Sequence, residues 1–139
     1  MPKEVRKIGA AGGLAVLWAV LCPAQTTPKP DLAASIESSR DVAFRETVTI
    51  SVTVTNKGTA PSPEALGELI VRNARPPRQI LKKSEKKIRK LEPRDSFTFT
   101  SPLKPGLGMY DICATVDPKN KIPEEEETNN KACLTLIGK

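Results

Sequence analysis

The stretch VDPKNKIPEEEETNNK, residues 116–131, is polar and rich in acidic and amide side chains. It lies between two short apolar runs, residues 109–116 and 131–137, and each run carries one cysteine. Apolar and polar residues alternate in both runs, which is typical of strands because successive side chains point to opposite faces. We therefore expect this stretch to join the last two strands of an antiparallel β-sheet.

The alternation also predicts where the two cysteines lie. One strand places four side chains on the face that must be the core face: Tyr110, Ile112, Ala114 and Val116. The other strand does the same with three: Ala132, Leu134 and Leu136. A register that pairs Ile112 with Leu134 therefore sets Cys113 and Cys133 opposite each other on the outer face, at a spacing that suits a disulfide. We expect this disulfide; the alternatives are two free thiols or a redox-active pair, although no Cys-x-x-Cys spacing supports the last.

Outward from these strands, the chain reads as further short strands separated by Pro, Gly and Asn. Residues 47–55 alternate strictly, with β-branched residues on both faces, as in a half-buried antiparallel strand. Other strands are expected at 31–37, at 66–72 and at 96–100, the last with Phe97 and Phe99 facing inward. In the connection 38–46, Val42 and Phe44 should turn into the core. This spacing predicts an all-β fold, an antiparallel β-sandwich of seven or eight strands.

The lysine-rich segment 79–91 is harder to assign. Its few apolar anchors are Ile80, Ile88 and Leu91. We expect one exposed edge strand or two short ones, and the alternative is a helix at 84–91, because Glu, Lys and Arg favour helices.

The first thirty residues predict export. Lys3, Arg6 and Lys7 precede an apolar run from Ile8 to Leu21, and small residues follow, as in a secretory signal peptide. We place the signal peptide at 1–24, a short linker at 25–30 and the folded domain at 31–139. The protein would then be secreted, periplasmic or at the cell surface, with no transmembrane helix after cleavage. The alternatives are an uncleaved N-terminal anchor and a lipid anchor at Cys22.

Composition argues against an enzyme. The chain of 139 residues has no histidine, and it shows neither a Gly-rich phosphate loop nor a nucleophile elbow. The net charge is +6, but aromatic residues are not interleaved with the basic ones as in single-strand nucleic-acid binders, so no nucleic-acid partner is expected. We expect a non-catalytic protein without a cofactor.

Two clusters of charge are candidate sites. The acidic stretch supplies oxygen ligands of the kind that Ca²⁺ takes: Asp117, Asn120, Glu124 and Glu127. The alternative for these residues is structural, with Asn and Asp side chains shaping a long loop. The basic residues between Arg72 and Arg94 could bind a polyanion, mainly through Arg75, Arg78, Lys82, Lys83, Lys86, Lys87, Arg89 and Lys90. Their alternative role is to keep an edge strand from pairing with other sheets.

Three segments together resemble a known family. They are PDL at 30–32, VTVTNKGTA at 52–60, and the acidic stretch with its DPKN start and ETNN end. They are similar to the CARDB domain, the cell-adhesion-related domain found in bacteria, from Pro30 to about Ile137. One departure is Arg94, which stands where the family usually has Gly in a Leu-x-Pro-Gly turn.

The resemblance implies an immunoglobulin-like sandwich on an exported, non-catalytic protein. We therefore expect an adhesion-related interaction module that binds another envelope protein or a surface polysaccharide. The alternatives are a structural or accessory subunit of an envelope assembly, and a polyanion binder that uses residues 72–94.

Overall fold

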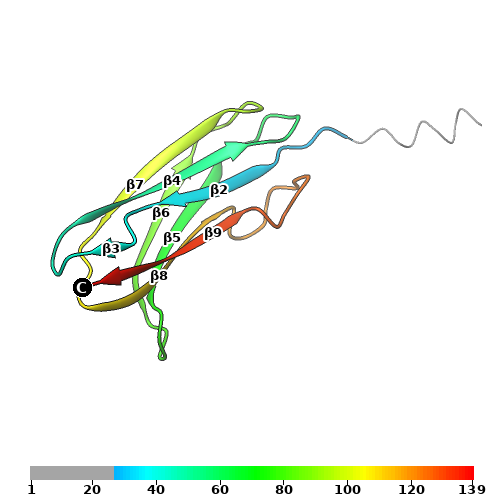
Figure 1. The fold of residues 1–139 in the computed structure, drawn as a ribbon. Helices are drawn as coiled ribbons and strands as arrows, with labels where there is room; N and C mark the ends of the chain where they lie inside the picture. Colours follow the sequence, from blue (N-terminus) through cyan, green and yellow to red (C-terminus); the bar gives the residue numbers. More distant parts are fainter. Residues whose placement is uncertain (1–26) are drawn as a thin grey trace, which may run out of the picture.

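A computed structural model describes residues 27–139, which form two β-sheets packed face to face (Figure 1). The smaller sheet has the strand order β2–β4–β7, with bounds Leu32–Glu37, Val48–Asn56 and Ser96–Leu103. The larger sheet has the order β3–β9–β8–β5–β6, with bounds Asp41–Val42, Lys131–Gly138, Gly108–Val116, Ala65–Asn73 and Ile80–Ile88. The predicted all-β sandwich is confirmed, with eight strands in the described part of the chain.

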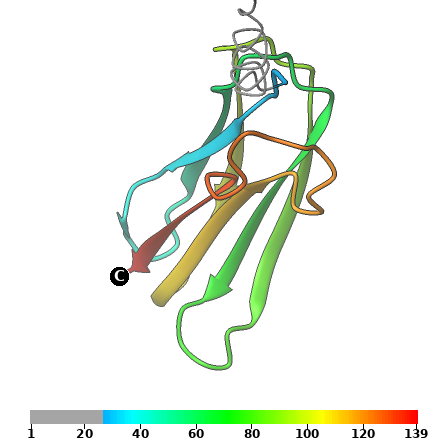
Figure 2. The same cartoon turned by 90° about the vertical axis from the view of Figure 1, so that its right-hand side faces the viewer.

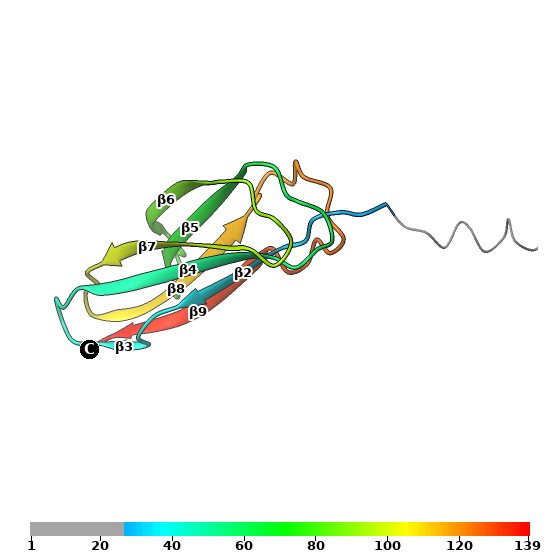
Figure 3. The same ribbon diagram turned by 90° about the horizontal axis from the view of Figure 1, so that it is seen from above.

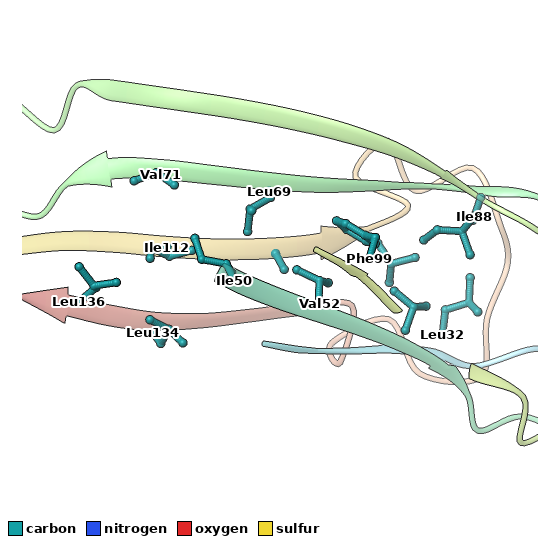
Figure 4. Packing of buried hydrophobic residues seen from close by; sticks show 14 of the residues in the cluster. Leu32, Ile50, Val52, Leu69, Val71, Ile88, Phe99, Ile112, Leu134 and Leu136 are labelled. Carbon is teal, nitrogen blue, oxygen red and sulfur yellow. The ribbon is translucent and has the colours of Figure 1, made fainter. Parts of the chain in front are cut away.

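The core lies between the two sheets and follows the alternation of the sequence. In β4, Val48, Ile50, Val52 and Val54 are all buried, while the threonines and the serine between them are not. Across the gap, β5 contributes Leu69 and Val71 (Figure 4). Each large aliphatic side chain that leaves water in this way stabilises the fold by about 1.5–3 kcal/mol. Phe97 and Phe99 both pack on this core, as predicted.

The connection between β2 and β4 differs from the expectation at one residue. Val42 is buried, and it belongs to β3, which pairs in parallel with the end of β9. The prediction that Phe44 turns into the core is wrong, because its side chain is 49% exposed. Arg45 follows with a positive φ of 64°, and its guanidinium lies 5.0 Å from the centre of the Phe44 ring, on the outside of the turn.

The lysine-rich segment forms the single strand β6, so the alternative of a helix at 84–91 is wrong. β6 pairs only with β5 and is the outermost strand of its sheet, as Figure 3 shows. Ile88 and Leu91 are buried as anchors, but Ile80 is 48% exposed. The register shifts between Val71 and Arg72, so that Ile80 pairs with Arg72 instead of facing the core.

The last two strands pair in the predicted register. Ile112 lies opposite Leu134, and Cys113 lies opposite Cys133. The two cysteine sulfurs are bonded, and the disulfide lies on the outer face of the larger sheet.

The beginning of the described chain is fastened to the domain. The Lys29 carbonyl accepts hydrogen bonds from the Thr59 and Ala60 amides, and the Pro30 carbonyl accepts one from the Glu125 amide. Part of the expected linker at 25–30 therefore belongs to the packed structure. The predicted signal peptide at 1–24, including Cys22, lies outside the described residues. Within residues 27–139, no helix is long and apolar enough to cross a membrane.

Candidate functional site

The acidic loop, residues 117–130, connects β8 to β9 and takes its shape from Asp117. Asp117 and Asn120 both have positive φ, 52° and 53°. One Asp117 carboxylate oxygen accepts a hydrogen bond from the Lys121 amide at 3.0 Å, and the other accepts one from the Ile122 amide at 2.9 Å. Asp117 is buried, so its carboxylate serves the backbone of the loop.

Glu124 joins this loop to the first strand of the other sheet. Its Oε1 accepts a hydrogen bond from the buried Leu32 amide at 3.0 Å, and its Oε2 accepts one from Asn130 Nδ2 at 3.3 Å. The residue is only 6% exposed. This burial raises the pKa of Glu124 to about 7; the nearby carboxylates of Glu127 and Asp117 add to the effect, while the two hydrogen bonds oppose it.

Further contacts fasten the same loop to the start of β2. The Asn129 carbonyl accepts a hydrogen bond from the Ala34 amide at 3.1 Å, and Asn129 Nδ2 donates to Asp31 Oδ1 at 2.9 Å. Figure 2 shows the loop, in orange, at the same end of the sandwich as the beginning of β2, in blue. The acidic loop therefore holds the N-terminal strand β2 in place through these hydrogen bonds.

Three of the four residues considered as calcium ligands have side chains that accept hydrogen bonds from backbone amides of the protein. Asp117 and Glu124 have their carboxylates on backbone amides, and Glu127 Oε2 accepts a hydrogen bond from the Glu124 amide at 3.2 Å. The Asn120 side chain lies at the surface. Within residues 27–139, no three acidic, histidine or cysteine side chains are grouped in a way that could hold a metal ion.

Asn56 is a structural centre that sequence reasoning missed. Its side chain is fully buried and makes four hydrogen bonds. Its Oδ1 accepts from the Asp31 and Gly58 amides, and its Nδ2 donates to the Ala60 and Leu91 carbonyls, at 2.8–3.1 Å. The signal was present in the Val-Thr-Asn-x-Gly segment, which we used only for the family resemblance.

The eight predicted polyanion-binding residues are spread along the β5–β6 turn, β6 and the segment after it. Arg75 lies in the turn, and Arg78 follows it and pairs with Asp111 at 2.8 Å. Beyond β6, Arg89 pairs with Asp95 at 2.7 Å and lowers the pKa of that carboxyl group through this hydrogen bond. Lys90 lies 3.6 Å from Glu92. Local acids thus partly neutralise the two ends of the basic stretch.

The four lysines of β6 keep more of their charge available. Lys83 Nζ lies 3.4 Å from a Glu68 oxygen, and Lys82 Nζ donates to the Pro102 carbonyl. Among residues 27–139, Lys86 and Lys87 form no ion pair, and both are exposed. The structure therefore gathers the unneutralised positive charge of the basic stretch on β6, at the open edge of the larger sheet.

The outer face of the larger sheet also has a hollow of about 310 Å³ next to Cys113. Its lining mixes charges of both signs with threonine, from Glu68, Arg72, Asp111, Thr115 and Lys131. Asp111 accepts a hydrogen bond from Thr135 at 3.2 Å and pairs with Arg78, so its carboxylate is engaged by neighbouring side chains.

Comparisons with known proteins agree with this geometry. The family model described as CARDB matches residues 29–133. No curated protein matches the chain significantly. Among solved structures, a CARDB domain from Pyrococcus furiosus, crystallised in complex with di-metal ions, is 26% identical with a TM-score of 0.69; the match covers 82% of this chain and 97% of that one.

Two more distant structures show the same fold. A domain from Methanosarcina acetivorans, from a protein whose cell-surface location is inferred, is 21% identical with a TM-score of 0.60, and the match covers 80% of this chain and 93% of that one. A β-glucosidase from Erythrobacter marinus is 16% identical with a TM-score of 0.57. That match covers 79% of this chain but only 16% of the enzyme.

Proposed function

This chain belongs to the CARDB family, and from that premise we propose that it is an exported, non-catalytic interaction module that binds another protein of the cell envelope. The disulfide supports export, because such bonds persist in oxidising compartments outside the cytosol. The relationship to a domain inferred to lie on a cell surface supports the same placement.

The observation that carries the proposal is the basic edge at β6. Lys82, Lys83, Lys86 and Lys87 lie on one strand that has no neighbour on its outer side among the described residues. A field of one sign attracts partners of the opposite sign and raises the rate of encounter. The acidic loop, in contrast, is engaged in fastening β2.

The acidic loop has a structural role in this proposal. The di-metal ions of the Pyrococcus furiosus domain belong to that protein. Here the carboxylates of Asp117 and Glu124 accept hydrogen bonds from backbone amides, which gives both a function without a cation.

Capture from the envelope fraction of the source cells tests the proposal. The chain, immobilised as bait, should retain one envelope protein at low salt and release it at high salt, because exposed charges are screened. A variant with Lys86→Glu and Lys87→Glu should lose this partner. A matched variant with Arg40→Glu and Lys139→Glu, exposed residues next to β3 at the opposite edge of the larger sheet, should keep it.

Three results would point elsewhere. Retention of a surface polysaccharide or an unrelated polyanion in place of a protein would favour the glycan or polyanion alternatives. A stable complex that high salt does not release would favour a structural subunit of an envelope assembly. Equal capture by both charge-reversed variants would contradict the role of β6.

A further inference from the structure

Backbone groups at the outer edge of β6 point away from the sheet. The Leu66 carbonyl accepts a hydrogen bond from the Asp117 amide on the β8 side, whereas the Asn73 amide donates to Gln79 on the β6 side. Backbone groups of a strand alternate in direction with period two. The even-numbered residues of β5 therefore turn their N–H and C=O groups toward β8 and away from β6.

The register carries this alternation across to β6. Lys87, Glu85 and Lys83 lie opposite Leu66, Glu68 and Ile70, which are the even-numbered residues of β5. Residues opposite each other in such pairs both direct their backbone groups outward. The N–H and C=O groups of Lys83, Glu85 and Lys87 thus face the free edge, in the spacing with which an added strand would pair.

Side chains on both faces of this edge carry mainly positive charge. Lys83, Glu85 and Lys87 share the outer face. Lys82 and Lys86 lie opposite Val71 and Gly67, and so belong to the inner face. A strand laid along β6 would meet four lysines and one glutamate, so acidic side chains at four of its positions would be favourable cross-strand partners.

We propose that β6 accepts an extended, acid-rich segment of a partner protein as an added strand of the larger sheet. The proposal rests on the function proposed above and names the partner's chemistry. Main-chain hydrogen bonds to residues 83, 85 and 87 hold the segment, and the lysines select its acidic side chains.

The same charges explain why another copy of β6 is a poor partner. Lysines on an exposed edge repel a like-charged edge, which prevents sheets from joining edge to edge. A polysaccharide or a lipid head group could satisfy the lysines, but it has no peptide backbone to pair with the edge. The two modes of binding therefore differ in their need for backbone hydrogen bonds.

A short peptide with a symmetric pattern of acidic residues provides the probe. The capped sequence Glu-Glu-Thr-Val-Glu-Glu places acids opposite all four lysines in either strand direction. Its binding to the full chain would be followed by fluorescence anisotropy at low salt. A second peptide with the same sequence is N-methylated at every peptide bond, so it keeps the charge but has no backbone N–H donor on either edge. We expect it to bind roughly tenfold more weakly.

Two variants at one position make the matching test on the protein. Glu85→Pro removes an edge-facing N–H that makes no bond to β5, and Glu85→Ala makes the same change of charge but keeps the N–H. Glu85→Pro should bind the unmodified peptide roughly tenfold more weakly than Glu85→Ala. Circular dichroism checks that both variants remain folded.

The outcomes separate the two proposals. Equal binding of the unmodified and N-methylated peptides would overturn strand addition and leave a purely electrostatic interaction module. Equal binding of the unmodified peptide by Glu85→Pro and Glu85→Ala would do the same. No binding of the unmodified peptide at low salt would also overturn strand addition, while capture of an envelope protein that depends on Lys86 and Lys87 would still support the proposed function.

Discussion

Replacing Glu124 by glutamine should make the fold more stable at neutral and alkaline pH, but not at acidic pH. Its carboxyl group has an ordinary pKa of 4.5 and a pKa of about 7 in the folded protein. Ionising this group in the fold therefore costs on the order of 3 kcal/mol. Glutamine keeps an acceptor for the Leu32 amide and carries no charge.

The direction of the pH dependence follows from the proton count. Between pH 4.5 and about 7 the folded chain holds the Glu124 proton and the unfolded chain has lost it. The free energy of unfolding of the wild type should therefore be highest below pH 4.5. It should fall by about 1.4 kcal/mol per pH unit as the pH rises, until the carboxyl group also ionises in the folded protein.

Asn130 explains why the uncharged form fits this position. Its Oδ1 is buried and has no hydrogen-bond partner within the described residues, while its Nδ2 donates to Glu124 Oε2. A rotation of the Asn130 amide by half a turn presents Oδ1 to residue 124. That oxygen can then accept the proton of a neutral carboxyl group, or an N–H of glutamine.

Urea unfolding followed by circular dichroism, at pH values from 4.5 to 8.5, measures the effect. The stability difference between Glu124→Gln and the wild type should grow with pH, toward on the order of 3 kcal/mol. Glu126→Gln, at an exposed position of the same loop, serves as the control and should show no such growth. A difference for Glu124→Gln that stays constant over this range would refute the reasoning.

Three other predictions concern stability. Replacing both Cys113 and Cys133 by serine should lower the free energy of unfolding by about 3 kcal/mol, because the disulfide closes a loop with a sequence separation of 20; unchanged urea midpoints would contradict this. Asn56→Ala should cost on the order of 3 kcal/mol, since it leaves buried backbone groups unpaired, and a loss below about 1 kcal/mol in the same assay would show that water replaces the side chain. The melting temperatures in calcium and in chelator should be equal, because the carboxylates of Asp117 and Glu124 are hydrogen-bonded to backbone amides. A higher melting temperature in calcium would instead support a calcium site in the acidic loop.

Local alternation was enough to predict much of this fold. The period of two in β4, β8 and β9 assigns each side chain to a face, and the face assignment sets the register that places Cys113 opposite Cys133. The edge position of β6 followed from its lysines, because charged residues crowd strands that remain open to water.

Features that depend on distant partners could not be predicted in this way. The two residues of β3 pair in parallel with the end of β9, and nothing in Asp41–Val42 signals that partner. Glu124 receives its hydrogen bond from Leu32, which lies 92 residues earlier in the chain. Asn56 likewise gathers contacts from three separate segments, and its sequence neighbours alone do not indicate a buried centre.

The fastening of β2 also determines how the domain would respond to tension. The start of β2 and the C-terminal Lys139 lie at opposite ends of the long axis (Figure 1). A pulling force between these ends runs along β2 and loads its six residue pairs with β4 in shear, together with the contacts of the acidic loop. Bonds loaded side by side share the force, whereas a strand peeled from one end loses them one at a time. The hydrogen bonds at Glu124 and Asn129 therefore make the N-terminal strand suited to bearing mechanical load.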